Sequence, residues 1–207
     1  MPGVPYQSQV FINAPFDLAY KPFFNALVFA VFDCGYAPRC SLEVEDGGEI
    51  RVAKIQRIIR ECGKGIHDIS RTTLDSKNRL PRFNMPFELG LFLGARWSGQ
   101  GKQRQKRCLI LDIDRYRFQK FISDVAGQDI KAHDSNIKTL IRAVRDWLRS
   151  SRPGVHIPDG AVIHRRYEKF LTDLPLLCKQ LGLKRDKLIY LEYCDLVRQW
   201  LEAFPLT

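Results

Sequence analysis

The chain lacks each of the short motifs that mark the commonest cofactor and nucleophile sites. It contains no GxGxxG or Walker A phosphate-binding loop, no HExxH metalloprotease pattern and no GxSxG nucleophile motif. Its four histidines are scattered, and its six cysteines form neither a CxxC pair nor a Cys/His cluster at zinc spacing. We therefore expect no metal site and no required cofactor.

Long apolar runs and a signal peptide are also lacking. The most apolar stretch, residues 23–32, is too short to span a bilayer and contains Asn25. Cys34, Cys62 and Cys108 lie inside apolar patterns, which is typical of buried free thiols. Unpaired cysteines suit a reducing compartment, so we expect a cytoplasmic protein that makes no contact with a membrane.

What is present is a core-forming composition with an excess of positive charge. The 207 residues are 45% hydrophobic and carry a formal net charge of +10. Such a charge favours anionic partners, among which we expect a small nucleotide. The densest basic run, residues 102–107, directly precedes a predicted strand, and loop solvation explains it as well as nucleic acid would. Nucleic acid is therefore an unlikely partner.

Predicted strands alternate with predicted helices through most of the chain. The apolar runs that predict strands are residues 9–13, 36–40, 64–69, 107–112 and 129–133. The helices between them are predicted at residues 21–33, 50–62, 86–95 and 136–149, and the pattern of the second places Ile50 inward and Arg51 and Lys54 outward. This alternation predicts an α/β protein with five parallel strands covered on both sides.

The strand pattern stops at a linker rich in Ser, Pro and Gly. We therefore predict an α/β domain over residues 1–152 and a C-terminal helical appendage over residues 153–207. Trp200, Leu201 and Phe204 form an apolar stripe near the end of the appendage. The stripe predicts either a homodimer contact or packing against the protein's own domain, and the sequence favours neither.

One acidic residue stands out in the middle of the chain. Glu88 lies near the start of an apolar helix, and none of its neighbours at helical spacing is a cation. Asp68 ends the preceding strand, and Asn84 is placed to cap the helix that carries Glu88. We predict that Glu88 is buried and lines a pocket together with Asp68. The competing interpretation is that an acid in a first helical turn only complements the helix dipole.

Three polar loops follow predicted strands, at residues 13–17, 41–49 and 68–84. In a parallel sheet the carboxyl ends of all strands lie at one edge, where ligands bind at the switch in strand order. These loops are therefore predicted to converge on one binding site.

The central stretch resembles a known pattern. Asp68-Ile69-Ser70, a polar loop and then Asn84-Met85-Pro86-Phe87-Glu88-Leu89-Gly90 resemble the strand–loop–helix core of nucleoside 2-deoxyribosyltransferase-like proteins and of bacterial Toll/interleukin receptor (TIR)-like nucleotide-binding proteins. Residues 11–16 resemble their first strand and base-binding loop, and the resemblance covers residues 8–150. It implies a flavodoxin-like or TIR-like three-layer sandwich.

The resemblance also implies a function and a set of site residues. The expected enzyme cleaves the N-glycosidic bond of NAD or of a nucleotide, as a glycohydrolase or a deoxyribosyltransferase. Glu88 would be the catalytic carboxylate, and Asp68 would orient the ribose or Glu88. The expected substrate-binding residues are Asn13, Phe16, Asp17, Arg71, Arg82 and Asn84.

Two alternatives remain open at the level of the sequence. The first is a nucleotide-sensing signalling module that uses the same pocket without turnover and transmits binding through its helical appendage. The second is a nucleic-acid-binding protein that uses its basic surface. Turnover of NAD or nucleosides would separate the enzyme from the sensor, and a steep salt dependence of DNA binding would support the second alternative.

Overall fold

The computed structural model describes residues 3–72, 83–125, 127–152 and 154–206. Its sheet contains β1 (Gln9–Asn13), β2 (Ala37–Arg39), β3 (Lys64–Asp68), β4 (Arg107–Asp112) and β5 (Ile130–Ala132). All pairings are parallel, and the strand order is β2-β1-β3-β4-β5. The predicted α/β class and the five-stranded parallel sheet are confirmed. The strand order changes direction at β1 and β3, so their carboxyl ends form the switch point where ligands bind in such folds.

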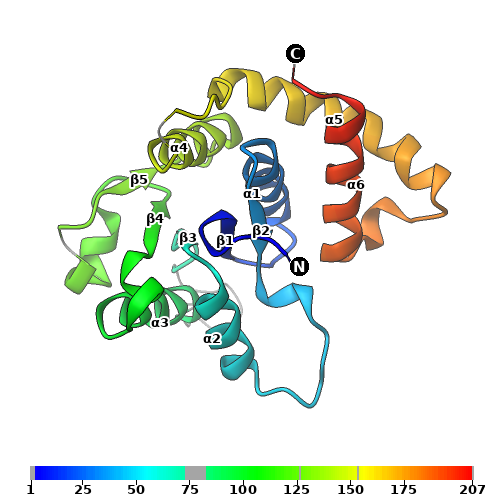
Figure 1. Cartoon of the computed structure of the whole chain (residues 1–207). Helices are drawn as coiled ribbons and strands as arrows, with labels where there is room; N and C mark the ends of the chain where they lie inside the picture. Colours follow the sequence, from blue (N-terminus) through cyan, green and yellow to red (C-terminus); the bar gives the residue numbers. More distant parts are fainter. Residues whose placement is uncertain (1–2, 73–82, 126, 153, 207) are drawn as a thin grey trace.

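Helices cover both faces of the sheet, as Figure 1 shows. The helices α1 (Lys21–Asp33) and α4 (Ile137–Ser150) pack together on one face, and α2 (Arg51–Glu61) and α3 (Asn84–Trp97) pack on the other. Alternate side chains of each strand point to opposite faces of the sheet and so contribute to the core on both sides. In β1, for example, Val10 and Ile12 join the core under α1 and α4, whereas Phe11 joins the cluster under α2 and α3.

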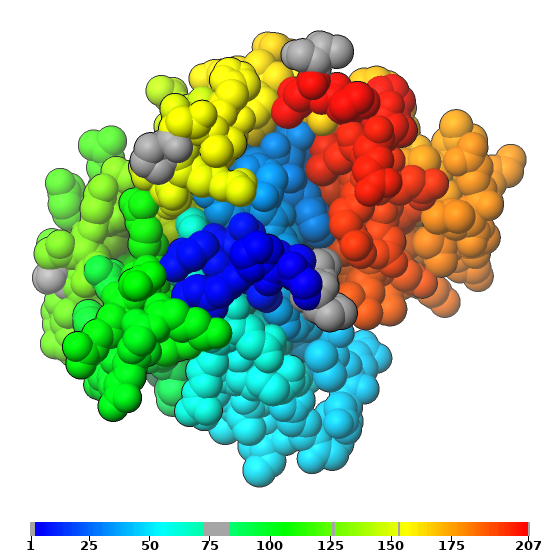
Figure 2. All heavy atoms as spheres, in the orientation of Figure 1, coloured from blue at the N-terminus to red at the C-terminus, as the bar shows by residue number. Residues whose placement is uncertain are grey.

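The C-terminal helices α5 (Gly160–Gln180) and α6 (Tyr190–Ala203) form a further layer outside α1 (Figure 1). Figure 2 shows the red atoms of α6 beside the blue atoms of α1. The described part of residues 154–206 contributes no strand to the sheet. Its buried side chains belong to the same apolar core as those of α1 and α4.

Aromatic rings and one ion pair join these outer helices to α1. The ring of Phe29 lies 5.4 Å from that of Phe170 and 5.8 Å from that of Trp200. Nearby, the guanidinium of Arg166 donates to both carboxylate oxygens of Asp33, at 3.1 and 3.0 Å. Trp200 is 2% exposed, so the largest residue of the terminal stripe packs inside its own chain. Trp200 therefore does not support the expected homodimer contact.

Three local predictions about helices are wrong. Ile50 is 72% exposed because α2 begins after it, and its extended backbone takes its side chain off the inward stripe. Lys54 is buried rather than outward, since its ammonium donates to the Val44 carbonyl at 2.7 Å. Asn84 does not cap α3, because Phe83 holds the capping position and Asn84 is the first helical residue.

Within the part of the chain that the structure describes, no helix combines the length and the apolar composition needed to cross a bilayer.

The shared core leads to a stability prediction. Replacing Trp200 with Ala should lower the free energy of unfolding by about 3–5 kcal/mol, because a large buried side chain leaves a cavity among Phe29 and Phe170. Phe204→Ala is the matched control, since this ring is 42% exposed and its loss should cost about 1 kcal/mol or less. Urea unfolding measures both. Equal small losses in the two variants would contradict the assignment of Trp200 to the core.

Candidate functional site

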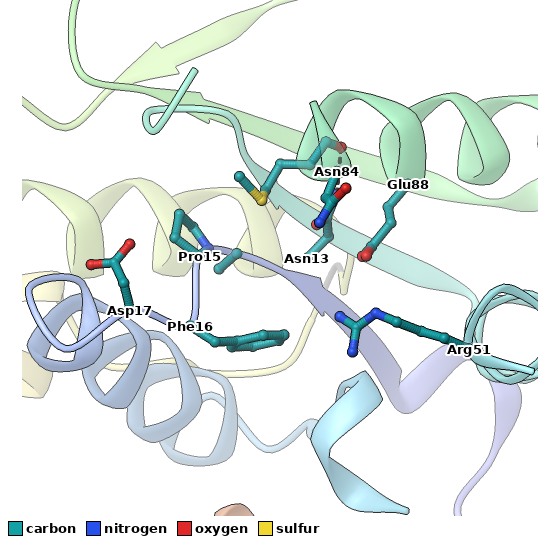
Figure 3. A pocket seen from close by; sticks show the side chains of 9 residues that line it. Asn13, Pro15, Phe16, Asp17, Arg51, Asn84 and Glu88 are labelled. Atoms are coloured by element: carbon teal, nitrogen blue, oxygen red, sulfur yellow. Dashed lines mark hydrogen bonds between the residues drawn. The ribbon is translucent and has the colours of Figure 1, made fainter. Parts of the chain in front are cut away.

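A cavity of about 310 Å³ lies at the carboxyl edge of the sheet, beside the end of β1 (Figure 3). The described part of its lining comes from three segments that the fold brings to this edge: the end of β1 with the loop after it, the first residue of α2 and the first turns of α3. The lining residues are Asn13, Ala14, Pro15, Phe16, Asp17, Arg51, Asn84, Met85 and Glu88. Five of the predicted site residues, namely Asn13, Phe16, Asp17, Asn84 and Glu88, are thus brought together.

Glu88 is the chemically distinctive residue of this cavity. It is only 6% exposed, and among the described residues no group donates a hydrogen bond to its carboxylate or forms an ion pair with it. Burial raises the pKa of Glu88 to about 7, although the positive charge of Arg51 lowers it in part. A carboxyl group with this pKa exchanges its proton near neutral pH, which suits acid, base or electrostatic work.

Asn13 fixes the start of α3 against the sheet. Its amide nitrogen donates to the Met85 carbonyl at 2.8 Å and lies 3.1 Å from Nδ1 of His67. Burial lowers the pKa of His67 to about 3, so its ring is neutral. Nδ1 of His67 therefore accepts the second amide hydrogen of Asn13, and Nε2 carries the ring proton. Although Asn13 lines the cavity, both of its N–H donors serve the structure.

Asp68 does not line the cavity. It is fully buried, and its carboxylate accepts hydrogen bonds from the Tyr20 hydroxyl and from the Ser70 backbone N–H, the latter at 2.9 Å. Nε2 of His133 lies 3.3 Å from the same carboxylate. The expectation that Asp68 shares the pocket with Glu88 is not met, and its carboxylate has no contact with Glu88.

The pleat of β3 explains this separation. Ile66 and Asp68 lie two residues apart and face α1 and α4, whereas His67 faces α3, where its ring lies 4.8 Å from that of Phe92. Glu88 is carried by α3, so the sheet separates it from Asp68. Asp68 acts through Tyr20, whose backbone N–H donates to Asp17 Oδ1 at 3.0 Å, and so supports the loop that carries Phe16.

The remaining predicted residues lie at the rim or outside the described part of the chain. Phe16 is 38% exposed, and its ring meets that of Phe24 edge-on at 5.3 Å. Arg71 is outside the lining, with its Nη2 atom 3.8 Å from Asp17 Oδ1. Arg82 lies outside the described residues.

Sequence reasoning missed Arg51, which was predicted to point outward. It is the first residue of α2, and in a parallel α/β fold each helix begins at the edge where the preceding strand ends. Arg51 is exposed, as predicted, and its one hydrogen bond within the described part of the chain is at the distance limit, 3.5 Å from Ser41 Oγ. Figure 3 shows the side chains of Arg51 and Glu88 extending into the same cavity. The position of Arg51 after a strand–loop unit was the signal that could have identified it.

Gly63 and Gly65, around the start of β3, lie where other parts of the chain pack closely against the backbone. A Cβ atom on Gly65 would lie 2.7 Å from both the His67 ring and the Phe92 ring, so only glycine leaves room for this packing. Phe92 belongs to α3, and the absence of a side chain at Gly65 therefore lets the Glu88 helix lie close to β3.

Comparison with protein-family models and with curated proteins found no match to this chain. The functional assignment therefore depends on the geometry of the site and on the resemblance of its residues to the pattern described above.

The buried carboxyl predicts a pH-dependent stability difference for Glu88→Gln. The folded-state pKa of about 7 exceeds the ordinary value of 4.5, so folded Glu88 retains a proton that the unfolded chain releases. The stability of the unchanged protein should therefore fall as the pH rises through this window. Glutamine has no such proton, and above pH 7 the variant should be more stable by up to roughly 3 kcal/mol.

Urea unfolding of both proteins at about pH 4 and about pH 8 measures this linkage. The two proteins should differ little at the lower pH and most at the higher pH. A difference that does not change with pH would show that the Glu88 carboxyl is well solvated or paired.

Proposed function

We propose that this protein cleaves the N-glycosidic bond of a nucleotide, NAD included, in the cavity that Glu88 lines. One observation carries the proposal: a buried carboxyl that has no hydrogen-bonding partner among the described residues faces a cavity that also contains the aromatic ring of Phe16 and the guanidinium of Arg51. An unpaired buried carboxyl destabilises the fold, which argues that it serves the ligand.

The chemistry of the bond matches a single carboxylate. The C1′–N bond breaks with its electron pair passing to the base nitrogen, and the sugar becomes cationic. An ionised Glu88 beneath the anomeric carbon would stabilise that cation or capture it as a glycosyl ester. Water then adds to C1′, the bond from C1′ to Glu88 breaks where the ester had formed, and the proton from water passes through the Glu88 carboxylate to the departed base or to solvent. A nitrogen of a second base can add in place of water and lose its proton in the same way. The first acceptor makes the enzyme a hydrolase and the second makes it a transferase.

The size and lining of the cavity suit one nucleoside unit. A volume of about 310 Å³ stands at the lower end of the range of small-molecule sites, roughly 300–1,000 Å³. Phe16 offers a ring face for a base, and Arg51 offers a planar pair of donors for a phosphate or a sugar hydroxyl. A cationic ring such as nicotinamide would also favour the ionised form of Glu88.

A nucleotide sensor without turnover is the second candidate, and one feature favours it. Phe16 lines the Glu88 cavity and also a larger cavity next to α5 and α6. A ligand that moves this ring would change the surroundings of the C-terminal helices, which is what a signalling module needs. Nucleotide binding without product formation would decide for the sensor.

If the protein is an enzyme, Glu88→Gln should lower the rate of base release by on the order of 10²–10³-fold. Glutamine keeps the size of the side chain but removes the negative charge on which a cationic transition state depends. Chromatography of products from NAD and from deoxynucleosides measures the effect, with thermal melts as a control for folding.

Asp68→Asn is the comparison variant for that experiment. Asp68 has no access to the cavity, so its replacement should reduce the rate less than Glu88→Gln does. Wild-type turnover that persists unchanged in Glu88→Gln would refute the catalytic assignment.

Arg51 provides a pH test of the same site. Because ionised Glu88 is the active form, kcat/KM should rise with pH through a limb near the pKa of about 7. Arg51→Gln removes a charge that lowers this pKa, so the limb should move to higher pH. Arg60→Gln is the matched control, since Arg60 belongs to the last turn of α2, away from the cavity. An identical limb in Arg51→Gln and the wild type would show that another group titrates.

A further inference from the structure

A second cavity, of about 780 Å³, lies between the first turns of α1, the helix α5 and the segment that joins α5 to α6. It is more than twice the size of the Glu88 cavity, and its volume is in the upper part of the usual range for ligand sites. Phe16 is the one residue common to both linings. Neither the catalytic proposal nor the sequence motifs assign a role to this space.

Aromatic and aliphatic side chains make up most of the described lining of this cavity. Three tyrosines line it, and each hydroxyl already donates to a backbone carbonyl: Tyr167 to Pro22 at 3.2 Å, Tyr190 to Pro38 at 2.8 Å and Tyr193 to Asn25 at 3.1 Å. Their hydroxyl donors are therefore satisfied within the protein. With their hydroxyls occupied, the tyrosines add apolar ring area to a lining that also contains Phe16 and Phe24, and such a lining suits a flat aromatic body.

Two cations in the lining have no ion-pair partner among the described residues, namely Lys21 and Arg185. Lys21 is half-buried at the start of α1, where the helix dipole disfavours a positive charge. An anionic group on a ligand would compensate both effects. Glu45 and Asp186 also line the cavity and, like Arg185, are exposed, so Lys21 is the most enclosed charge of the lining, and the chain as a whole carries a net charge of +10.

We propose that this cavity is a second ligand site, separate from the Glu88 site, for a flat aromatic ring that carries one anionic group. The aromatic and aliphatic walls bind the ring, and Lys21 and Arg185 bind the anion. Glu45 and Asp186 oppose the accumulation of further negative charge, so one anionic group suits the site better than a polyphosphate. The proposal does not depend on catalysis by Glu88.

Two probes that are both aromatic anions test whether the ligand is a nucleotide or another aromatic anion. Adenosine monophosphate represents nucleotides, and 8-anilinonaphthalene-1-sulfonate represents other aromatic anions. Titration of the full chain, by calorimetry for the first probe and by fluorescence for the second, should show saturable binding of at least one probe at one site per chain, in addition to any adenosine monophosphate that binds in the Glu88 cavity. Replacing Lys21 and Arg185 together with Gln should weaken that binding about tenfold or more, since charge-assisted contacts are lost.

Three further variants locate the binding. Leu171→Trp, on the partly buried lining of α5, should also weaken it by filling the space. Lys184→Gln removes an exposed cation next to the cavity that does not line it, and should leave binding unchanged. Arg51→Gln alters only the Glu88 cavity, so it should leave the binding that depends on Lys21 and Arg185 unchanged, even where it weakens adenosine monophosphate binding in the Glu88 cavity.

The proposal is overturned if neither probe binds saturably. It is also overturned if Lys184→Gln weakens binding as much as the double variant, or if Arg51→Gln abolishes all binding of both probes while Leu171→Trp weakens none. Binding of the sulfonate alone supports the site and assigns it to aromatic anions other than nucleotides.

Discussion

The hydrogen bond from the Asn13 amide to the Met85 carbonyl, 2.8 Å long, is the contact on which the geometry of the site depends. Asn13 ends β1, Met85 lies in the first turn of α3, and the same amide reaches His67 at the end of β3. One side chain thus ties together the two strands at the switch point and the helix that carries Glu88. The bond is buried, so its loss would leave donors and an acceptor unsatisfied in a region closed to water.

The hydrogen bond from Asn13 to Met85 helps to hold Glu88 in a buried position, where its carboxyl group is less readily ionised than its place in the helix would favour. The second turn of a helix is near the positive end of the helix dipole, which favours an ionised carboxylate. Burial acts in the opposite direction and is stronger, since the pKa of Glu88 rises to about 7 despite the positive charge of Arg51. A carboxyl group buried in this way destabilises the folded state. Such a conflict between local chemistry and burial is a feature of sites that act on ligands.

The sequence predicted the sheet well because its strands are continuous apolar runs between turn residues. The bounds of β1, α1 and β4 agree with the prediction, and Glu88 was identified because no cation lies at helical spacing from it. The side of the sheet that Asp68 faces could also have been predicted, since the period of two along a strand places Asp68 on the same side as Ile66. What led the prediction astray was the assumption that residues at one edge of a sheet share one cavity.

Other features of the structure, Arg51 in the site among them, could not be predicted from local patterns. The inward position of Lys54 depends on the Val44 carbonyl, which a loop brings within reach. The contact between Trp200 and Phe29 joins residues far apart in the chain, and a single apolar stripe does not state whether its partner lies in the same molecule. Arg51 lies beyond an acidic loop whose path sets where α2 begins. Each of these depends on tertiary packing, which overrides local propensity.

The proposed role of the site depends on the protonation state of the Glu88 carboxyl group. Carbon-13 NMR of the glutamate side chains measures this state directly. The Glu88 resonance, identified by its absence from Glu88→Gln, should titrate with a pKa of about 7 in the free protein. Arg51→Gln should raise that value, because the cation that favours the ionised form is removed. A Glu88 resonance that titrates near the ordinary value of 4.5 would contradict the account, since it would describe a solvated or paired carboxylate with no reserve for a ligand.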